Sequence, residues 1–403
     1  MEEWKEYKLK DATSILGDGI HGTPKYDDAG PVFFINGNNL ENGKIVIKDN
    51  TKRVSLEEAN KHKKPLTERT LFVSINGTLG NVARYNGESC ILGKSACYFN
   101  VKEEFDIDFI YYVVANSEFK NEIERLATGT TIKNVSLETM RNYTFYAPSL
   151  KTQKQIASIL KSLDDKIEVN RKINDNLEQQ AQALFKSWFV DFEPFKDGEF
   201  VESELGMIPK GWRVVSLGDL MCYNGGSQPP ASEFIEVYKE GYIRFIQIRD
   251  YASDGHITYI PISKRNKLCD VKDIMIARYG ASLGRICFGL KGAYNVALAK
   301  VTPLKDYFRE YLRCFLNTRE FYEGINNKGN RAVQAGFNQS DIQSFRLPFP
   351  TDDDIIMVFE KLCSSYFERR LLNDQESRRL AELRDTLLPK LMSGELKVNE
   401  PMN

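Results

Sequence analysis

The sequence has little of what marks a secreted, membrane or zinc-binding protein. No apolar run approaches the roughly 20 residues that a helix needs to cross a bilayer, and the charged residues 1–5 lack the apolar core of a signal peptide. The seven cysteines include no Cys-x-x-Cys pair, which favours reduced thiols. The three histidines lie far apart and show no zinc-binding pattern. We therefore expect a cytoplasmic protein with no membrane segment and no metal site.

The charge of the chain neither favours nor excludes nucleic acid as a partner. Its formal net charge is −1, whereas nucleic-acid binders often carry basic domains. Local fields matter more than the total, and residues 210–300 hold 13 Lys and Arg against 8 Asp and Glu. With 403 residues, 42% of them hydrophobic and 28% charged, the chain has a globular composition and is too long for one core. Two or more domains are expected.

Nearly the same sequence pattern occurs twice. The motif Trp-x-x-Tyr-x-Leu-x-Asp at residues 4–11 returns as Trp-x-x-Val-x-Leu-x-Asp at residues 212–219. A long helical pattern that opens at Thr152 returns at Thr351, 199 residues later. The chain therefore holds two similar but non-identical units. Such a duplication suits a target made of two different parts.

Each unit ends in a long helical pattern whose apolar residues alternate at spacings of four and three. This heptad rhythm is typical of a coiled coil. Its polar interruptions coincide in the two copies, and polar residues in a helix seam can fix the alignment of the helices. We predict that the two helices pair antiparallel; the alternative is that each packs on its own domain. The predicted seam consists of Ile156, Leu160, Leu163, Ile167, Asn170, Asn174, Leu177, Ala181, Leu184 and Trp188 in the first helix and Ile355, Phe359, Leu362, Tyr366, Arg369, Asn373, Glu376, Leu380, Leu383 and Leu387 in the second.

Both helices have clear starting signals. Pro148 and Pro350 precede them, and Thr152 and Thr351 are candidate N-caps. Each pattern runs for about 39 residues, which corresponds to about 58 Å of helix, or about 17 base pairs of B-DNA. The length predicts a rigid spacer.

The globular halves, about residues 1–148 and 205–349, combine short strands with one helix each, expected at 107–126 and 307–325. Glycines recur at equivalent places in the two halves, while the polar residues between them change. We predict an α/β (α+β) fold of two similar globular domains joined by two long antiparallel coiled-coil helices, with a pseudo-twofold internal repeat. The expected strands are 32–35, 71–75, 95–101, 243–248, 273–277 and 296–301.

No motif predicts catalysis by this chain alone. Gly-x-Gly-x-x-Gly at residues 17–22 is followed by a loop instead of the helix that a dinucleotide site needs. The Gly-Lys-Ser at 93–95 stands one residue too far from Gly87, behind a strand-like segment, to form a phosphate-binding loop. Ser-Gln-Pro-Pro at 227–230 resembles a loop of amino-methyltransferases but lacks its aromatic residue, and no glycine-rich methyl-donor loop precedes it. We expect no catalytic residues.

Five stretches carry a resemblance to a known family. They are Gln-Lys-Gln-Ile-Ala-Ser-Ile-Leu-Lys-Ser-Leu-Asp-Asp-Lys-Ile at 153–167, Asn-Arg-Lys-Ile-Asn at 170–174, Leu-Phe-Lys-Ser-Trp-Phe-Val-Asp-Phe at 184–192, Leu-Gly-Met-Ile-Pro-Lys-Gly-Trp at 205–212 and Leu-Leu-Pro-Lys-Leu-Met-Ser-Gly at 387–394. With these, the chain resembles the specificity subunits of type I restriction–modification systems over essentially its whole length. The second helix departs from the pattern, because three aspartates at 352–354 replace a Gln-rich start.

The resemblance implies a non-catalytic subunit that binds double-stranded DNA. Two target-recognition domains, residues 1–150 and, with a linker, 192–350, would each bind one half of a bipartite, asymmetric sequence. A central helix, 151–191, and a distal helix, 351–392, would act as spacers, and 393–403 would be a tail. The spacers would bind two modification (methyltransferase) subunits, and restriction/translocase subunits would join the complex. The chain would need no cofactor, because S-adenosylmethionine would belong to the modification subunits and ATP and Mg to the restriction subunits.

The candidate DNA contacts are polar residues of the loops in both units. Amide side chains suit adenine and arginine suits guanine in the major groove, whereas exposed lysines suit phosphate. For each residue the alternative is a surface position without DNA contact. The candidate base contacts are Asn36, Asn38, Asn39, Asn76, Thr78 and Lys133 in the first unit and Gln247, Arg249, Arg278, Tyr279, Arg331 and Gln334 in the second. The candidate phosphate contacts are Lys25, Lys61, Lys63, Lys264, Arg265 and Lys267.

Two other functions remain open. The chain could be a self-contained DNA methyltransferase or nuclease with fused recognition domains, although the missing methyl-donor and catalytic loops argue against this. It could also be a coiled-coil scaffold that presents two ligand domains and binds no DNA. The globular halves alone fit that second alternative.

Overall fold

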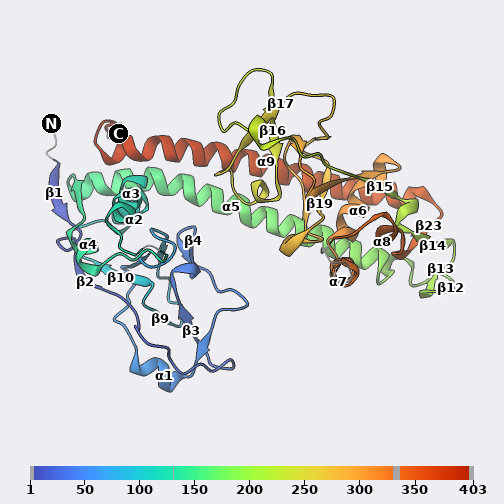
Figure 1. Cartoon of the computed structure of the whole chain (residues 1–403). Helices are drawn as coiled ribbons and strands as arrows, with labels where there is room; N and C mark the ends of the chain where they lie inside the picture. Colours follow the sequence, from blue (N-terminus) through green and yellow to red (C-terminus); the bar gives the residue numbers. More distant parts are fainter. Residues whose placement is uncertain (1–3, 130, 330–335, 399–403) are drawn as a thin grey trace, which may run out of the picture. The chain divides into compact units, whose positions relative to one another are not determined.

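The structure, a computed structural model, describes residues 4–129, 131–329 and 336–398. It divides into two compact units (Figure 1): unit 1 comprises residues 1–168 and 377–403, and unit 2 comprises residues 169–376. Two helices, α5 (Leu150–Phe189) and α9 (Asp353–Met392), each contribute one part to both units.

The centre of unit 1 is a four-stranded antiparallel sheet in the order β2-β10-β7-β8. Every residue of β10 (Ala96–Val101) and β7 (Thr70–Ser74) is buried, so both faces of these strands are covered. A smaller sheet, β6-β3-β9, contains the parallel pair β3/β9, and β1 pairs with β11. The other strands are β1 (Lys5–Lys8), β2 (Thr13–Gly17), β3 (Val32–Ile35), β4 (Leu40–Glu41), β5 (Lys44–Ile45), β6 (Arg53–Val54), β8 (Val82–Arg84), β9 (Cys90–Leu92) and β11 (Thr144–Ala147).

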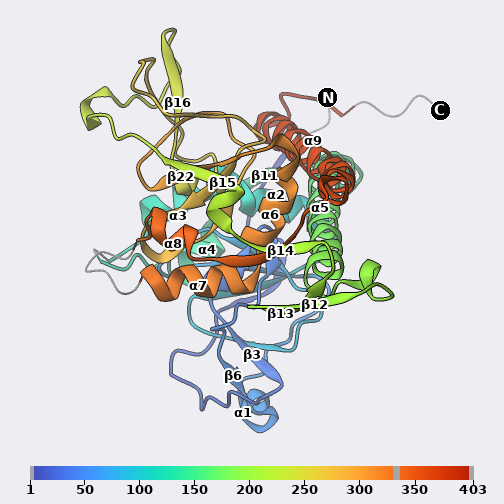
Figure 2. The same cartoon turned by 90° about the vertical axis from the view of Figure 1, so that its right-hand side faces the viewer.

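Unit 2 repeats this topology. Its central sheet has the order β15-β22-β19-β20, its smaller sheet β17-β16-β21-β18 again contains one parallel pair, β16/β21, and β14 pairs with β23. In both cartoon views β16 and its neighbouring loops project from the rest of unit 2 (Figures 1 and 2). The strands are β12 (Phe200–Ser203), β13 (Gly206–Pro209), β14 (Trp212–Ser216), β15 (Met221–Gly225), β16 (Tyr242–Ile246), β17 (Thr258–Pro261), β18 (Leu268–Cys269), β19 (Ile274–Ala277), β20 (Ile286–Cys287), β21 (Gly292–Tyr294), β22 (Leu298–Pro303) and β23 (Arg346–Pro350).

The single helix expected in each globular half is in fact two short helices. In unit 1 the break falls at Asn116, whose backbone is extended and whose side chain caps the next helix by accepting from the Glu118 N–H. In unit 2 the Thr318 hydroxyl accepts from the Phe321 N–H at the same kind of break. The helices besides α5 and α9 are α1 (Leu56–Lys61), α2 (Ile107–Ala115), α3 (Ser117–Leu126), α4 (Leu137–Asn142), α6 (Arg309–Leu316), α7 (Arg319–Gly329) and α8 (Gln339–Gln343).

The long helices are part of the hydrophobic core of each unit. In unit 1 Ile156 and Leu160 of α5 and Leu391 of α9 are buried together with strand residues such as Phe99. Burial of each large apolar side chain is worth roughly 1.5–3 kcal/mol, so the helices and sheets stabilise one another.

In unit 2 aromatic rings fill the equivalent space. The Phe189 ring of α5 lies 5.0 Å from the Phe359 ring of α9 and 4.8 Å from the Tyr311 ring of α6, with near-perpendicular planes in both pairs. Such edge-to-face contacts add to the burial energy of the rings.

Within unit 2, α5 and α9 run antiparallel through a polar layer. Asn170 Nδ2 donates to Glu376 Oε2 at 2.8 Å, and Asn373 Nδ2 donates to Asn174 Oδ1 at 2.8 Å. As the residue number rises along α5, the number of its partner falls along α9. Within unit 1, the Asp164–Arg384 ion pair (2.6 Å) joins the two helices as well. The predicted α/β fold, with two similar units and antiparallel helices, is confirmed.

The seam predicted for α9 is wrong in part. No predicted seam residue of α5 is exposed, but on α9 Leu362 is 41% exposed, Leu383 is 47% exposed and Arg369 is exposed as well. Cys363 and Phe367 are buried instead. In unit 2 α9 packs against the globular core as well as α5, so its buried residues follow the 3.6-residue period of a helix on a globular surface.

The two predicted N-cap residues, Thr152 and Thr351, do not cap the helices. Thr152 lies inside α5, and its N–H donates to the Ser149 hydroxyl at 3.4 Å. The start of α9 is capped by Asp352, whose Oδ1 accepts from the Asp354 N–H at 2.9 Å, so Thr351 is not the cap.

A buried arginine joins α9 to the globular part of unit 2. Arg313 is 1% exposed and donates from Nε to Glu310 Oε2 at 2.6 Å. Its guanidinium lies 4.3 Å from the centroid of the Phe288 ring and 4.6 Å from that of Phe367 on α9. The paired charge and the two rings fix the position of α9 against α6.

Candidate nucleic-acid interface

The same short turn follows β3 in unit 1 and β16 in unit 2. The Asn36 N–H donates to Asn39 Oδ1 at 3.0 Å, and the Gln247 N–H donates to Asp250 Oδ2 at 2.7 Å. Asn39 is 4% exposed and Asp250 is 3% exposed. One position therefore closes both turns, with an amide in one unit and a carboxylate in the other.

The predicted base contact of Asn39 is wrong. Its Nδ2 donates to the Val46 carbonyl at 3.0 Å, which together with its burial gives it a structural role. Asn38 is exposed, whereas Asn36 is half-buried and its Oδ1 accepts from the Ser95 hydroxyl at 2.9 Å. Asn38 is thus the residue of this turn that faces solvent.

The candidates Asn76, Thr78 and Lys133 come together on two neighbouring loops of unit 1. Asn76 Nδ2 donates to Asn134 Oδ1 at 3.1 Å, and the backbones of these two residues form an isolated bridge. The Gly77 N–H donates to the Lys133 carbonyl at 3.0 Å. Thr78 and Lys133 are exposed.

Arg278 in unit 2 occupies the backbone position that Ile75 has in unit 1. The Ile75 N–H donates to the Ser95 carbonyl at 3.0 Å, and the Arg278 N–H donates to the Ala297 carbonyl at 2.9 Å. Ile75 is 3% exposed, whereas the Nε of half-buried Arg278 has no hydrogen-bond partner among the described residues. The Arg278 guanidinium lies 5.0 Å from the centroid of the Tyr279 ring. Unit 2 thus holds a cation at a position that is apolar in unit 1.

Two candidate base contacts, Arg331 and Gln334, lie outside the described residues. Of the others in unit 2, Gln247 is half-buried, Arg249 is exposed, and Tyr279 is 42% exposed.

All six candidate phosphate contacts are exposed, and one of them is paired with acidic neighbours. Lys61 Nζ lies 3.1 Å from Glu57 and 3.3 Å from Glu58, and hydrogen bonding to Glu57 raises the pKa of Lys61. These carboxylates offset its attraction for phosphate. The other five exposed candidates are Lys25, Lys63, Lys264, Arg265 and Lys267.

A pocket of about 480 Å³ in unit 1 gathers polar residues that lie far apart in the sequence. Asp18, His21 and Lys94 line it together with Asn76 and Asn134. His21 Nε2 lies 2.7 Å from Asp18 Oδ2. Asp18 and His21 come from the Gly-x-Gly-x-x-Gly segment and Lys94 from the Gly-Lys-Ser segment. The sequence patterns marked both segments but gave no sign that they meet.

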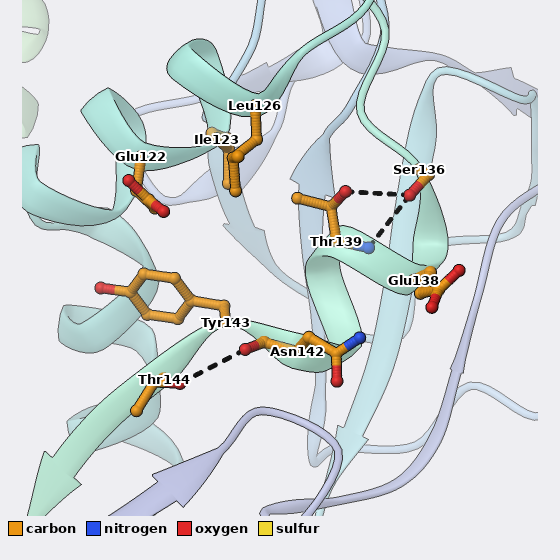
Figure 3. Close-up of a pocket in the computed structure, with 9 residues that line it drawn as sticks. All are labelled: Glu122, Ile123, Leu126, Ser136, Glu138, Thr139, Asn142, Tyr143 and Thr144. Atoms are coloured by element: carbon orange, nitrogen blue, oxygen red, sulfur yellow. Dashed lines mark hydrogen bonds between the residues drawn. The ribbon is translucent and has the colours of Figure 1, made fainter.

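A second pocket of unit 1, of about 510 Å³, lies between α3, α4 and β11 (Figure 3). Its lining includes the carboxylates of Glu122 and Glu138, and none of the nine residues that line it is basic. Burial raises the pKa of the Tyr143 hydroxyl there to about 12. An acidic lining repels phosphate, so this pocket is a poor DNA contact.

The described residues include no group of three or more His, Cys, Asp or Glu that could hold a metal ion. None of the described helices is both long and apolar enough to cross a membrane. All seven cysteines are free, and burial raises the pKa of the Cys269 and Cys287 thiols to about 11. Thiols held protonated in this way are poor nucleophiles.

Comparison with known proteins identifies the duplicated scaffold. A sequence model of the type I restriction modification DNA specificity domain matches residues 1–179 and 209–364, one match for each copy of the repeat. The chain belongs to this family. The specificity-domain relatives include the type I restriction enzyme MjaIX specificity subunit of Methanocaldococcus jannaschii, which is 28% identical across 99% of this chain and 95% of the relative. The HindI specificity subunit of Haemophilus influenzae is 24% identical across 98% of this chain and 100% of the relative.

A crystal structure of the type I restriction–modification S subunit from M. genitalium has the same fold. It superposes with a TM-score of 0.55 at 18% identity and covers 97% of this chain and 96% of that one. The specificity-domain family thus accounts for the repeat, the two globular halves and the long helices.

Proposed function

We propose that this chain is the DNA-recognition subunit of a type I restriction–modification complex and that each unit binds one half of a bipartite, asymmetric target. The observation that carries the proposal is one scaffold bearing unequal side chains: Ile75 and Asn76 in unit 1 stand where Arg278 and Tyr279 stand in unit 2. Two readers of different base sequences require a common framework with different contacting groups.

The side chains suggest the kind of base that each unit recognises. The Arg278 guanidinium has the geometry to donate to O6 and N7 of a guanine, and the Asn76 amide suits an adenine; each such pair discriminates by about 1–3 kcal/mol. The exposed lysines Lys63 and Lys264 would bind phosphate and set the position of each unit without selecting sequence.

The chemistry of the complex would belong to other subunits. We propose that two modification subunits, which bind S-adenosylmethionine, dock on α5 and α9, and that restriction subunits supply the ATP- and Mg-dependent steps. The chain itself would then bind no cofactor and act in the cytoplasm on duplex DNA.

The test is to assemble the chain with its modification subunits and sequence the methylated adenines on genomic DNA. We expect one split motif with two dissimilar halves and a gap of constant length. Binding to a duplex that carries this motif should weaken steeply with salt, as expected for a protein that contacts several phosphates.

Two results would contradict the proposal. Methylation by the purified chain alone would make it an enzyme in its own right. Methylation by the complex at adenines that share no sequence motif would mean that the chain does not select DNA sequence.

A further inference from the structure

We infer that the pocket around Asp18 and His21 makes unit 1 select a base whose major-groove edge carries an amino group, which is adenine or cytosine. Bases whose major-groove edge carries a keto oxygen, guanine and thymine, would be disfavoured. The inference rests on the proposed function and names a residue, Asp18, that the loop patterns did not mark as a DNA contact. A carboxylate only accepts hydrogen bonds in the major groove, so it attracts the amino groups and repels the keto oxygens of guanine and thymine.

The Asp18 carboxylate has accepting capacity beyond its bond to His21. The Asp18 side chain is 19% exposed and lies on the wall of the pocket, while the His21 side chain is 75% exposed. Two carboxylate oxygens offer about four acceptor sites, and the contact with His21 occupies one. His21 therefore orients the carboxylate without saturating it.

The backbone holds this loop in one place. The Ile20 N–H donates to the Leu92 carbonyl at the end of β9 at 2.7 Å. A Cβ at Gly19 would lie 2.0 Å from the same carbonyl oxygen, so only glycine allows this approach. Asp18 is thus presented from a fixed position at the end of a buried strand.

The rest of the pocket complements an amino-bearing base. The bond between Asn76 and Asn134 uses the nitrogen of the first amide and the oxygen of the second. Within the described residues, Asn76 Oδ1 and Asn134 Nδ2 make no side-chain hydrogen bond, so the first can accept from a base and the second can donate to one. Lys94 also lines the pocket and is exposed. Its positive charge attracts a neighbouring DNA phosphate and so offsets the repulsion between that phosphate and Asp18.

Unit 2 has the same loop geometry without the acid. Its Ser227 N–H donates to the Tyr294 carbonyl at the end of β21 at 3.1 Å, and a Cβ at Gly226 would lie 2.0 Å from the Asn295 carbonyl oxygen. The residue at the position of Asp18, directly before this glycine, is Gly225, which has no side chain, and Gln228 stands at the position of His21. The amino-group selection should therefore be confined to the half-site read by unit 1.

A carboxylate beside DNA leaves a signature that a purely structural residue does not. Its repulsion of the DNA phosphates acts on every sequence. Only a hydrogen bond to a base amino group offsets that repulsion. Asp18→Asn keeps the shape, removes the charge and adds a donor. It should therefore bind unrelated duplex more tightly while losing discrimination at one base position.

The experiment uses the complex assembled with modification subunits and compares wild type, Asp18→Asn and Asp18→Ala. Methylated motifs are obtained from a randomised duplex library, and affinity is measured for an unrelated duplex. At one position of one half-site, the preference for adenine or cytosine over guanine or thymine should fall about tenfold or more, with the other half-site unchanged. Asp28→Asn, the same change of charge at an exposed residue of unit 1 that does not line the pocket, is the control and should keep the wild-type motif.

Wild-type discrimination at every position in both Asp18 variants would overturn the inference and leave the proposed function standing. Loss of discrimination in both half-sites would also overturn it, because it would point to a structural role. A wild-type complex that methylates without any motif would instead overturn the proposed function. Thermal melting of the isosteric Asp18→Asn chain confirms that it is folded.

Discussion

In the loops that carry the candidate DNA contacts, some residues hold the loop in its conformation, and others have side chains that could contact DNA. Asn39 and Asp250 close equivalent turns and are buried, so a change of residue type left their role intact. Ile75 and Arg278 share a backbone position but differ in chemistry, one packed in the core and the other holding a donor without a partner in the described residues. Differences of this second kind are where two half-sites would be distinguished.

Arg278→Ala should relax the target sequence at one base of the half-site read by unit 2. Loss of a bidentate contact to guanine costs about 1–3 kcal/mol, or roughly 5- to 150-fold in discrimination. Sequencing the DNA that the assembled complex methylates measures this directly.

Arg285→Ala is the matched control, since Arg285 is an exposed arginine of the same unit. It should weaken binding equally on all sequences or leave it unchanged. If Arg278→Ala keeps every base preference of the wild type, Arg278 does not contact a base.

Glu360 should make the stability of the chain depend on pH near neutrality. It lies on α9, where its Oε2 accepts from the Glu310 N–H at 2.8 Å. Burial raises its pKa from 4.5 to about 7; the Glu310 charge adds to the rise, and the Glu310 N–H, Arg309 and Arg313 oppose it. Because the folded pKa exceeds the unfolded one, the stabilising contribution is present below pH 4.5 and is lost as pH rises through 7.

Glu360→Gln should therefore be more stable than wild type at pH 8, by about 1–2 kcal/mol after allowing for the partial exposure of the group. The difference should vanish towards pH 4.5. Urea denaturation of both chains at a series of pH values measures it, and a difference independent of pH would exclude titration of Glu360 as the cause.

At the level of elements, the paired helices combine an apolar seam with a buried polar layer. Asn170, Asn174 and Asn373 are all buried, and each would cost stability if its amide were unpaired. Asn373 pairs with Asn174 and Asn170 pairs with Glu376 across the seam, so any shift of one helix along the other is penalised. The layer therefore sets the alignment of α5 and α9 at some cost in maximal stability.

Asn373→Leu should lower the free energy of unfolding by about 1–3 kcal/mol, because it removes the donor to Asn174 Oδ1 and leaves that oxygen buried without it. Urea denaturation of the whole chain measures the loss.

The double change Asn174→Leu with Asn373→Leu should recover part of that loss, because it removes both buried amides, whereas Asp374 Oδ1 still loses its hydrogen bond from Asn174 Nδ2. If the double variant loses the sum of the two single losses, the amide pair is not the source of the effect.

For the whole molecule, the decisive feature is that each long helix belongs to both units. α5 and α9 each continue through residues that fall in unit 1 and unit 2. A helix of about 40 residues spans roughly 60 Å. The rigid spacer expected from the sequence, with its constant gap between half-sites, stays a prediction.

Inserting one heptad into both helices should lengthen the gap in the methylated motif. Insertion between Glu168 and Val169, and between Glu376 and Ser377, falls at the boundaries of the two units, so each unit keeps its own residues together. Seven residues add about 10 Å of helix, equivalent to about three base pairs. The motif methylated by the assembled complex gives the gap.

A heptad inserted into only one helix is the control. It breaks the register either of the polar layer in unit 2 or of the Asp164–Arg384 pair in unit 1, so it should destabilise the chain instead of changing the gap. An unchanged gap in the doubly extended, folded chain would refute the spacer.

The sequence by itself determined the duplication, the two long helices and six of the strands, because these depend on patterns between neighbouring residues. The helix breaks at Asn116 and Thr318 were missed, since one side-chain hydrogen bond decides each of them. Asn36, Asn39 and Gln247 are predicted as base contacts, whereas the closure of the two turns by Asn39 and Asp250 was missed.

Only the tertiary structure decided which residues of α9 face inward and which loops meet. Leu362 and Cys363 are both plausible seam residues in sequence, and the packing of α9 against a globular core as well as α5 buries the second. Asp18, Lys94 and Asn134 come from three distant segments and line one pocket because β2, β10 and the segment before α4 converge there. Local periodicity encodes the elements, whereas the recognition surface arises from long-range contacts that no short pattern contains.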